Sequence, residues 1–289
     1  MAHPHQRRPE NIPGDFYVDL TCIDCDTCRW MAPEVFYEIG DQSAVYHQPN
    51  TEVERLHAMQ ALLSCPTASI GTVEKPVDIK QIQASFPILI ADNVYHCGYH
   101  AETSFGAASY LILREIGNIL VDSPRFSPPL VKRLEELGGL HYLYLTHQDD
   151  VADHQKFRQH FGCDRILHTD DITANTREVE IQLSGLDPVQ LEPDLLIIPV
   201  PGHTKGHTVL LYDKRFLFTG DHLAWSSTLN HLIAFRQACW YSWTELTQSM
   251  HQLANFSFEW VLPGHGRRYH ADRNIMHQQM QQCLTWMER

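Results

Sequence analysis

The stretch that decides the fold, residues 201–207, reads PGHTKGH and follows the apolar run LLIIPV. A run of that kind predicts a buried strand, and the proline and glycine after it predict a turn that ends the strand. His203 then stands just beyond a strand end, where side chains of an α/β sheet often meet a ligand. One histidine in that place means little, so other strands must end in the same way.

Three more apolar runs end in residue types that bind metals. YLYLT leads to His147, RFLFTG to Asp221 and WVLPG to His265. Residues 146–154, THQDDVADH, add a dense group of aspartates and a further histidine after the first of these runs. Strands that end at one edge of a sheet can bring their terminal side chains together. Imidazole and carboxylate groups gathered there predict a metal site.

Between residue 84 and residue 289, short apolar runs alternate with longer polar segments. The apolar runs predict strands, and four polar segments predict helices over 128–137, 150–161, 243–256 and 273–287. This alternation is typical of an α/β fold.

In their order along the chain, the T-H-x-x-x-D-H-like loop, PGHTKGH, FTGD and LPGHG resemble the motifs of the metallo-β-lactamase superfamily. The resemblance implies an αββα sandwich over residues 84–289, with a metal site at one edge. It also implies two sets of metal ligands that share Asp221. One set is His147, Asp149, His203 and Asp221, and the other is Asp153, His154, His265 and Asp221.

The loop departs from the family pattern H-x-H-x-D-H in two ways. Asp149 stands at the position of the second histidine, and the pair Asp153-His154 comes two residues late, as though Val151 and Ala152 were inserted. Asp150 is therefore an alternative ligand to Asp149. We expect one of these two aspartates to cap the helix that follows. A site that has lost its metals is the other interpretation, but uncompensated buried charges disfavour it.

Other residues near these motifs have weaker signals. His207 orients ligands, contacts the substrate or packs, and His222 either orients ligands or lies on the surface. The aromatic segment 234–243 forms either a substrate wall or core. Nothing in the sequence shows whether His96, Tyr99 and His100 line the pocket.

The N-terminal segment contains a cysteine cluster of a different kind. Cys22, Cys25 and Cys28 have the spacing C-x2-C-x2-C, and Cys65-Pro66 follows much later. Residues 14–75 thus resemble a small α+β bacterial-type ferredoxin with one [4Fe–4S] cluster, because a second set of cysteines is missing. A capping box at 51–54 predicts a helix through Leu63 that carries Cys65 back to the other three. A zinc knuckle and a ferredoxin without a cluster are the alternatives.

The remaining cysteines are scattered and are expected to be small buried side chains: Cys97, Cys163, Cys239 and Cys283. Residues 71–83 are expected to link the two domains. A formal charge of −13 and a pI near 5.8 disfavour nucleic-acid and anionic-membrane partners. No apolar stretch approaches the roughly 20 residues that span a bilayer, and the first residues lack the apolar segment of a secretory signal. We therefore expect a soluble, cytoplasmic protein.

The resemblance implies a metal-dependent hydrolase with two divalent ions, which are zinc, iron or manganese. A metal-bridging hydroxide, oriented by Asp153 and held with Asp221, would attack an ester, thioester, lactone or phosphodiester in a small-molecule substrate. The rival is a diiron oxidoreductase that reduces oxygen or nitric oxide, because the superfamily's diiron members resemble this chain in having a carboxylate at the position of Asp149. A cluster fed by a redox partner would supply its electrons. An iron–sulfur sensor or binding protein is the third possibility.

Overall fold

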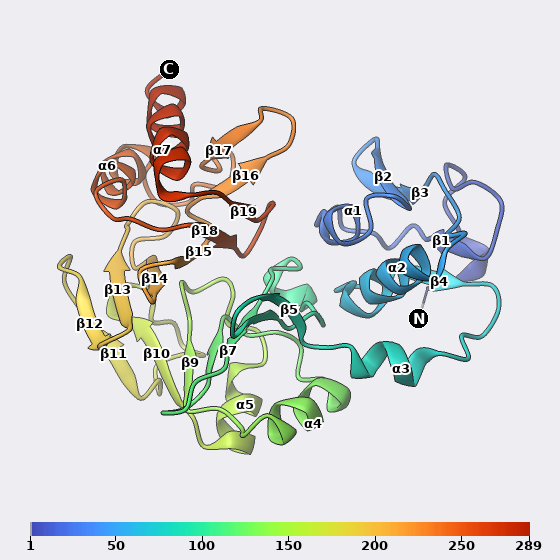
Figure 1. Cartoon of the computed structure of the whole chain (residues 1–289), viewed down its shortest axis with the longest axis horizontal. Helices are drawn as coiled ribbons and strands as arrows, with labels where there is room; N and C mark the ends of the chain where they lie inside the picture. The colour runs from blue at the N-terminus through green and yellow to red at the C-terminus, as the bar shows by residue number, and fades with distance from the viewer. Residues whose placement is uncertain (1) are drawn as a thin grey trace.

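The computed structural model describes residues 2–289. Figure 1 shows a small N-terminal part, in blue, beside a larger layered part whose colours extend from green to red. In chain order, the elements of the small part are η1 (Pro4–Gln6), β1 (Phe16–Val18), α1 (Thr27–Met31), β2 (Phe36–Ile39), β3 (Gln42–Val45), α2 (Glu52–Ser64) and β4 (Ile70–Thr72). Strand β1 pairs with β4 and β2 pairs with β3, both antiparallel, and α1 packs on α2.

Helix α2 confirms the helix that the capping box predicts. The hydroxyl of Thr51 accepts a hydrogen bond from the Glu54 amide at 3.2 Å, so a free amide of the first turn is satisfied. The helix ends at Ser64, and Cys65 is its C-terminal cap. The position of Cys65 beside the other cysteines therefore depends on where this helix starts and how long it is.

The larger part is a sandwich of two mixed sheets. In the described chain, the first sheet has seven strands, in the spatial order β11 (Ile181–Leu183), β10 (Asp164–His168), β9 (Tyr142–Tyr144), β8 (Ile119–Val121), β7 (Tyr110–Ile112), β6 (Val94–His96) and β5 (Ile88–Ala91). The second sheet has six, in the order β12 (Val189–Glu192), β13 (Leu195–Pro199), β14 (Thr208–Tyr212), β15 (Phe216–Gly220), β18 (Trp260–Pro263) and β19 (Tyr269–His270). A separate hairpin is formed by β16 (Ala224–Ser226) and β17 (His231–Ile233).

Alternation along the strands builds the layers. In β7, Tyr110 and Ile112 point into the core between the sheets, while Leu111 between them packs on the outer side. Helices α4 (Pro128–Glu136) and α5 (His154–Phe161) cover that outer side of the first sheet. Helices α6 (Trp243–Leu253) and α7 (Arg273–Met287) cover the second sheet. The result is the expected αββα sandwich.

The helices end close to their predicted boundaries, with one exception. Helix α5 begins at His154, four residues later than the predicted start at Asp150. Its N-cap is Asp153, so the expectation that Asp149 or Asp150 caps this helix is wrong. Residues 147–153 instead form a loop, and Asp149 and Asp150 in this loop turn toward the end of the sandwich.

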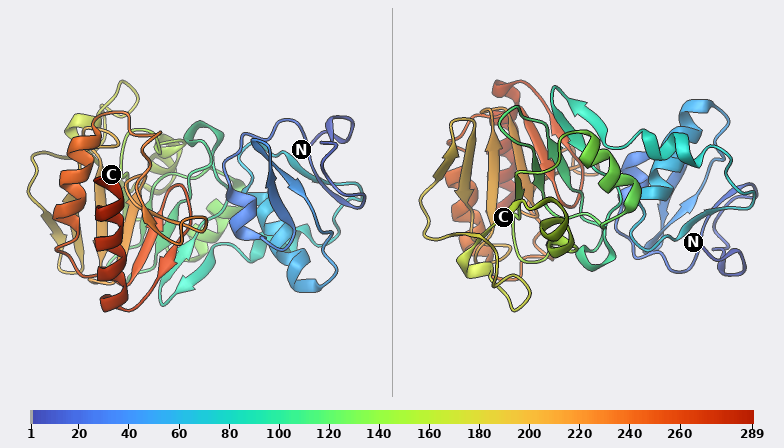
Figure 2. Two further views of the ribbon diagram at one scale, coloured as in Figure 1. Left: turned by 90° about the horizontal axis from the view of Figure 1, so that it is seen from above. Right: turned by 90° about the horizontal axis from the view of Figure 1, so that it is seen from below.

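The two parts are packed against each other without an open linker. Residues 71–72 belong to β4, and α3 (Ile79–Ala84) occupies the end of the predicted link. Phe86 and Tyr99 of the sandwich belong to the same buried apolar cluster as Met59 and Cys65 of the small part. The His100 amide donates to the Ser64 carbonyl at 3.2 Å. Figure 2 shows the small part set against one end of the sandwich in both views.

Two short 3-10 helices, η2 (Glu102–Ser104) and η3 (Thr169–Asp171), lie in loops of the sandwich. Among residues 2–289, no helix has both the length and the apolar character that crossing a bilayer requires.

Candidate metal and cluster sites

The predicted ligands converge because their strands share directions. Strand β13 is antiparallel to β14, which is antiparallel to β15, and β15 is parallel to β18. Their carboxyl ends therefore lie at the same edge and lead to His203, Asp221 and His265. In the other sheet, β9 leads to His147 and is parallel to β8. The site is thus built from loops at one edge of the sandwich.

One group of side chains has the spacing of ligands around a single ion. The Oδ2 atom of Asp149 lies 3.4 Å from His203 Nε2 and 3.8 Å from His147 Nε2. Asp221 Oδ2 lies 3.8 Å from His147 Nε2 and 3.7 Å from His203 Nε2. Ligands about 2.1 Å from one ion are separated by distances of this size. Within residues 2–289, neither of these two Nε2 atoms has a hydrogen-bond partner, although both are buried. The group therefore fits a metal ion.

A hydroxyl sets the tautomer of His147. Thr146 donates its single hydroxyl proton to the Asp122 carboxylate at 3.0 Å, and its oxygen lies 2.9 Å from His147 Nδ1. That oxygen must then accept from Nδ1–H. The lone pair of His147 is consequently on Nε2, which faces Asp149 and Asp221.

A second group adjoins the first through Asp221. Asp150 is grouped with His147 and Asp221 at ligand-to-ligand distances within 4.8 Å. His265 Nδ1 lies 2.8 and 2.9 Å from the two oxygens of Asp221. Both oxygens of Asp150 are buried and lack a partner among the described residues. A Cβ at Gly264 would come within 2.7 Å of Asp150 Oδ2, so the glycine of the LPGHG motif makes room for this carboxylate.

The second group concentrates negative charge in a buried place. Burial, followed by the charge of Asp221, raises the pKa of Asp150 well above its ordinary value. Burial alone would lower the pKa of His265, but Asp221 against it raises that pKa to about 10. The carboxylates of Asp149, Asp150 and Asp221 lie close together and would repel one another if all were charged. A proton or a metal ion must therefore compensate part of their charge.

The protonation states of the first group differ from those of the second. The His203 imidazole lowers the pKa of Asp149, which keeps this carboxylate charged. Burial lowers the pKa of His147 to about 4, although Asp221 opposes the shift. A charged Asp149 carboxylate beside a neutral His147 imidazole is the protonation state that metal binding needs.

Asp153 and His154 lie elsewhere. The Asp153 carboxylate accepts from the Phe126 amide at 2.8 Å and pairs with Lys156 at 2.7 Å. His154 Nδ1 lies 3.1 Å from the Arg165 guanidinium. Neither side chain belongs to a potential metal group in the described chain. The structure therefore does not bring these two predicted ligands to the second group, because the start of α5 turns both side chains away from the sheet edge.

Asp150 takes the place that Asp153 was expected to fill. Val151 and Ala152 lie between Asp150 and the start of α5. They therefore lengthen the loop after Asp150 and leave the position of Asp150 relative to His147 unchanged. Of the seven predicted ligands, the structure brings together five: His147, Asp149, His203, Asp221 and His265. That these side chains bind metals stays a prediction.

Sequence reasoning missed two buried aspartates. Asp122 follows β8 and accepts from the Thr146 amide at 2.8 Å. Asp171 accepts from the Gln148 amide, the Thr204 hydroxyl and the Gly206 amide at 2.6 to 3.0 Å, and so ties the loop of His147 to that of His203. The run NILVDS carried the signal for Asp122, because it too is a strand that ends in a carboxylate. No local signal singles out Asp171.

The second histidine of PGHTKGH supports the site from behind. The ring of His207 stacks on that of His147, with centroids 4.7 Å apart, and His207 Nε2 accepts from the Asp221 amide at 3.2 Å. His222 is buried with its ring centroid 5.8 Å from that of His207. His207 therefore contacts two of the predicted ligands, His147 and Asp221. His96 and His100 lie in a different place, at the boundary between the two parts.

The four cysteines of the small part lie near one another, because the charges of the other three all raise the pKa of Cys28. Cys28 and Cys65 are buried, and Cys22 and Cys25 are half-buried. Burial raises the pKa of Cys25 to about 11, and the nearby Cys65 and Cys22 raise it further. The Ser69 amide donates to Cys65 Sγ at 3.3 Å, and Thr27 Oγ1 lies 3.4 Å from Cys25 Sγ. Clustered buried thiols with hydrogen bonds to sulfur fit an iron–sulfur cluster, whose iron compensates the thiolate charge.

Comparison with known proteins agrees with this division. Residues 18–72 match the family described as the 4Fe-4S single cluster domain of Ferredoxin I. No curated protein sequence matches the chain.

Solved structures that resemble the chain are metallo-β-lactamases. VMB-1 superposes with a TM-score of 0.53 at 17% identity, covering 70% of this chain and 96% of its own. The B3 metallo-β-lactamase BLEG-1 has a TM-score of 0.52 at 16% identity, covering 68% and 100%. FIM-1 from Pseudomonas aeruginosa, solved in a mono-zinc form, has a TM-score of 0.51 at 15% identity, covering 68% and 93%. At this identity the likeness establishes the fold. The chain therefore consists of a single-cluster 4Fe-4S ferredoxin domain followed by a domain with the metallo-β-lactamase fold.

Proposed function

We propose that the chain is an oxidoreductase with a carboxylate-rich diiron site that receives electrons from its own [4Fe–4S] cluster. The observation that carries this proposal is the composition of the site. Three carboxylates alternate with three imidazoles at the sheet edge: Asp149, Asp150, Asp221, His147, His203 and His265. Mixed carboxylate and histidine ligands suit non-haem iron, whereas sites richer in histidine or thiolate suit zinc.

The side chains divide between two ions. His147, His203 and Asp149 would hold one, Asp150 and His265 the other, and Asp221 lies between the groups. When bound, two iron ions would exchange electrons with a small oxidant such as dioxygen or nitric oxide. Burial raises the pKa of Asp150, so a metal bound there would compete with a proton for this carboxylate.

The ferredoxin domain supports the same proposal. Hydrolysis needs no electrons, so a cluster packed into the core shared with the catalytic domain has no evident task in a hydrolase. Metal-dependent hydrolysis is the second candidate, because the structural neighbours carry the names of β-lactam hydrolases. The expected role of Asp153 in that reaction is not supported, since its carboxylate pairs with Lys156.

Metal analysis separates the two candidates. The protein is purified without oxygen, and iron, zinc and manganese per chain are measured for the native protein and for Cys22→Ser. About six irons, with about two remaining in Cys22→Ser, support the diiron proposal. About four irons with about two zincs contradict it and favour hydrolysis.

A matched cysteine variant controls for general damage. Cys163→Ser changes a buried cysteine outside the cluster and should retain every iron. The iron-loaded protein, reduced chemically, is then tested for consumption of dioxygen and of nitric oxide. An iron-loaded protein that consumes neither would also contradict the proposal.

A further inference from the structure

We propose that the peptide joining Phe105 to Gly106 is the electronic contact between the cluster and the metal site. This inference rests on the proposed function and specifies the route that electrons take. The peptide lies just after η2, in the loop that separates Cys25 of the ferredoxin domain from His265 of the sandwich. Neither residue belongs to a motif that the sequence marks as functional.

On the cluster side, the backbone touches a cluster cysteine. Gly106 has φ +86°, and a Cβ there would lie 2.8 Å from Cys25 Cβ and 3.0 Å from Cys25 Sγ. Thr27 Oγ1 lies 3.4 Å from both Cys25 Sγ and the Gly106 carbonyl oxygen. The loop is thus in van der Waals contact with the cysteine, and no side chain fits between them.

On the metal side, the same peptide reaches a predicted ligand. The Phe105 carbonyl oxygen lies 3.3 Å from His265 Nε2, while His265 Nδ1 faces Asp221. The Ala108 amide donates to the Gly264 carbonyl at 2.7 Å and holds the loop against the LPGHG segment. Since the Phe105 carbonyl and the Gly106 Cα belong to one peptide plane, a single planar unit spans the space between Cys25 and His265.

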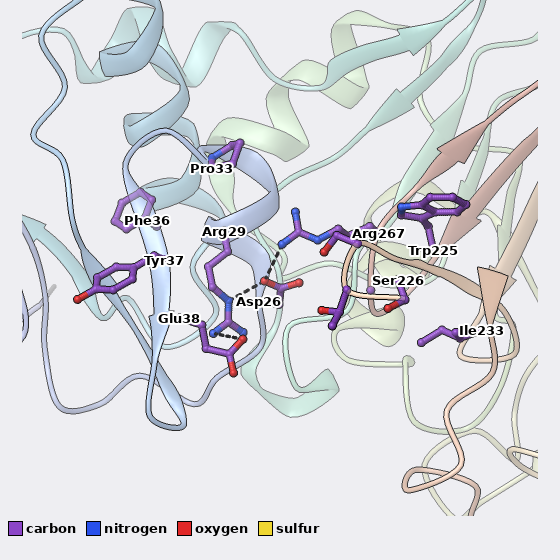
Figure 3. Close-up of a pocket in the computed structure, with 13 residues that line it drawn as sticks. Asp26, Arg29, Pro33, Phe36, Tyr37, Glu38, Trp225, Ser226, Ile233 and Arg267 are labelled. Atoms are coloured by element: carbon purple, nitrogen blue, oxygen red, sulfur yellow. Dashed lines mark hydrogen bonds and ion pairs between the residues drawn. The ribbon is translucent and has the colours of Figure 1, made fainter. Parts of the chain in front are cut away.

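A second tie keeps the two loops together. Arg267, two residues after His265, pairs with Asp26 at 3.5 Å, and Asp26 follows Cys25 directly. Asp26 also accepts from Arg29 at 2.6 Å, so it joins the two arginines, as Figure 3 shows. The three residues line a cleft of about 430 Å³ between the ferredoxin domain and the β16–β17 hairpin. The Arg268 guanidinium lies 4.5 Å from the centroid of the Trp30 ring and adds a cation–π contact across the same boundary.

A buried histidine pair holds Gly106 in place. His100 Nδ1 lies 2.7 Å from the Gly106 carbonyl oxygen, so it carries a proton and donates. His100 Nε2 then accepts from His96 Nε2 at 2.8 Å. Both rings are buried, and each lies against Trp30 of helix α1. His100 is therefore a positioning residue for this contact.

The redox step is simple to balance. One electron leaves the reduced cluster, which is oxidised by one electron, and one ferric ion of the site becomes ferrous. No covalent bond breaks, and a low-potential one-electron donor refills the cluster.

The test displaces the Phe105–Gly106 peptide by a substitution that changes no predicted ligand of the cluster or of the metal site. Gly106→Ala forces the loop away from Cys25, whereas Gly185→Ala introduces the same left-handed strain, at φ +87°, where nothing in the described chain lies within 4 Å. In the iron-loaded protein with a ferric site, the cluster is reduced by a light flash with a photoreductant, and its reoxidation is followed by absorbance. We expect reoxidation to slow by about tenfold or more in Gly106→Ala, because the contact is displaced, and to be unchanged in Gly185→Ala. Equal rates in the two variants would overturn the inference.

A measurement on the native protein guards against loss of the cluster in Gly106→Ala. The site is loaded with Mn²⁺ or with Zn²⁺, and the spin relaxation of the reduced cluster is measured by electron paramagnetic resonance. Faster relaxation with Mn²⁺ supports the short distance between the two centres that the contact requires, and identical relaxation overturns the inference. A dissolved mediator separates this inference from the proposed function. If the mediator reduces the site but the cluster does not, only the route fails; if nothing reduces the site, the proposed function fails as well.

Discussion

The loop that carries Cys22, Cys25 and Cys28 and the loop of residues 146–154 are both rich in candidate ligands, yet they differ in how many of these side chains the fold brings to one place. In the cysteine loop, the spacing alone identifies every ligand that the structure brings together. In the second loop, THQDDVADH, the structure directs His147, Asp149 and Asp150 to the sheet edge, and Asp153 and His154 away from it.

The difference teaches where spacing is a reliable guide. Three cysteines within one short loop must enclose whatever they bind, because few backbone paths connect them. The metal site draws on strand ends of two sheets, and its ligands are chosen by the direction that each loop takes after its strand. An insertion before α5 leaves the residue types unchanged while altering which of them face the site.

The largest expected effect tests the choice between Asp150 and Asp153. Asp150→Asn should lose metal from the second group and lower activity by at least about 100-fold, since loss of groups even outside the ligands costs tenfold to 100-fold in such sites. Asp153→Asn should keep its metals, because Asp153 faces Phe126 and Lys156. Site metals per chain in the two variants provide the measurement. Loss of metal in Asp153→Asn, with metal retained in Asp150→Asn, would support instead the ligands that the family resemblance implies.

Removal of one cysteine sharpens the contrast between the two centres. Cys65→Ser should abolish the visible absorbance and the paramagnetic signal of the cluster, because a thiolate ligand is lost. The site metals should remain, since their ligands come only from the sandwich. Loss of both sets of metals together would show that the two centres do not assemble independently.

A smaller effect depends on pH and concerns the boundary between the two regions. Burial lowers the pKa of His100 to about 3, from 6.5 in an exposed histidine. Between these values the unfolded chain binds a proton that the folded protein does not, so stability rises with pH. The free energy of unfolding should therefore fall as the pH decreases from about 6.5 toward 3, and should not change through this group at higher pH.

Urea unfolding at about pH 7.5, about pH 6.0 and about pH 5.0 checks this prediction. His100→Gln should reduce the dependence, because the amide does not titrate there. A native protein equally stable at all three values would contradict the assignment of a neutral buried His96–His100 pair.

The smallest expected effect concerns the helix that delivers Cys65. Thr51→Ala removes the cap of α2 and should lower the free energy of unfolding by about 1 kcal/mol. Thr285→Ala, within α7, removes an exposed hydroxyl bonded only to the Gln281 carbonyl and should change stability by less than about 0.5 kcal/mol. Chemical unfolding measures both. An equal effect of the two would show that the capping bond contributes little.

The αββα architecture, the ferredoxin domain and the approach of His147, Asp149, His203, Asp221 and His265 to one another could be predicted from the sequence. These features depend on short-range patterns: the period of two in strands, the capping box of α2, and glycines that end strands beside a histidine or an aspartate. Each pattern reflects local backbone preferences and burial, which neighbouring residues are sufficient to express.

The tertiary structure was needed to show that Asp150, and not Asp153, lies beside His147 and Asp221, that Asp171 joins two loops of the site, and that Gly106 touches Cys25. These facts depend on the late start of α5 and on how the ferredoxin domain docks. The late start of α5 and the docking of the ferredoxin domain both result from packing between segments far apart in the chain, which a local sequence pattern cannot predict. The physical reason is that the direction of a loop is set by what its ends pack against, whereas the type of its residues is not.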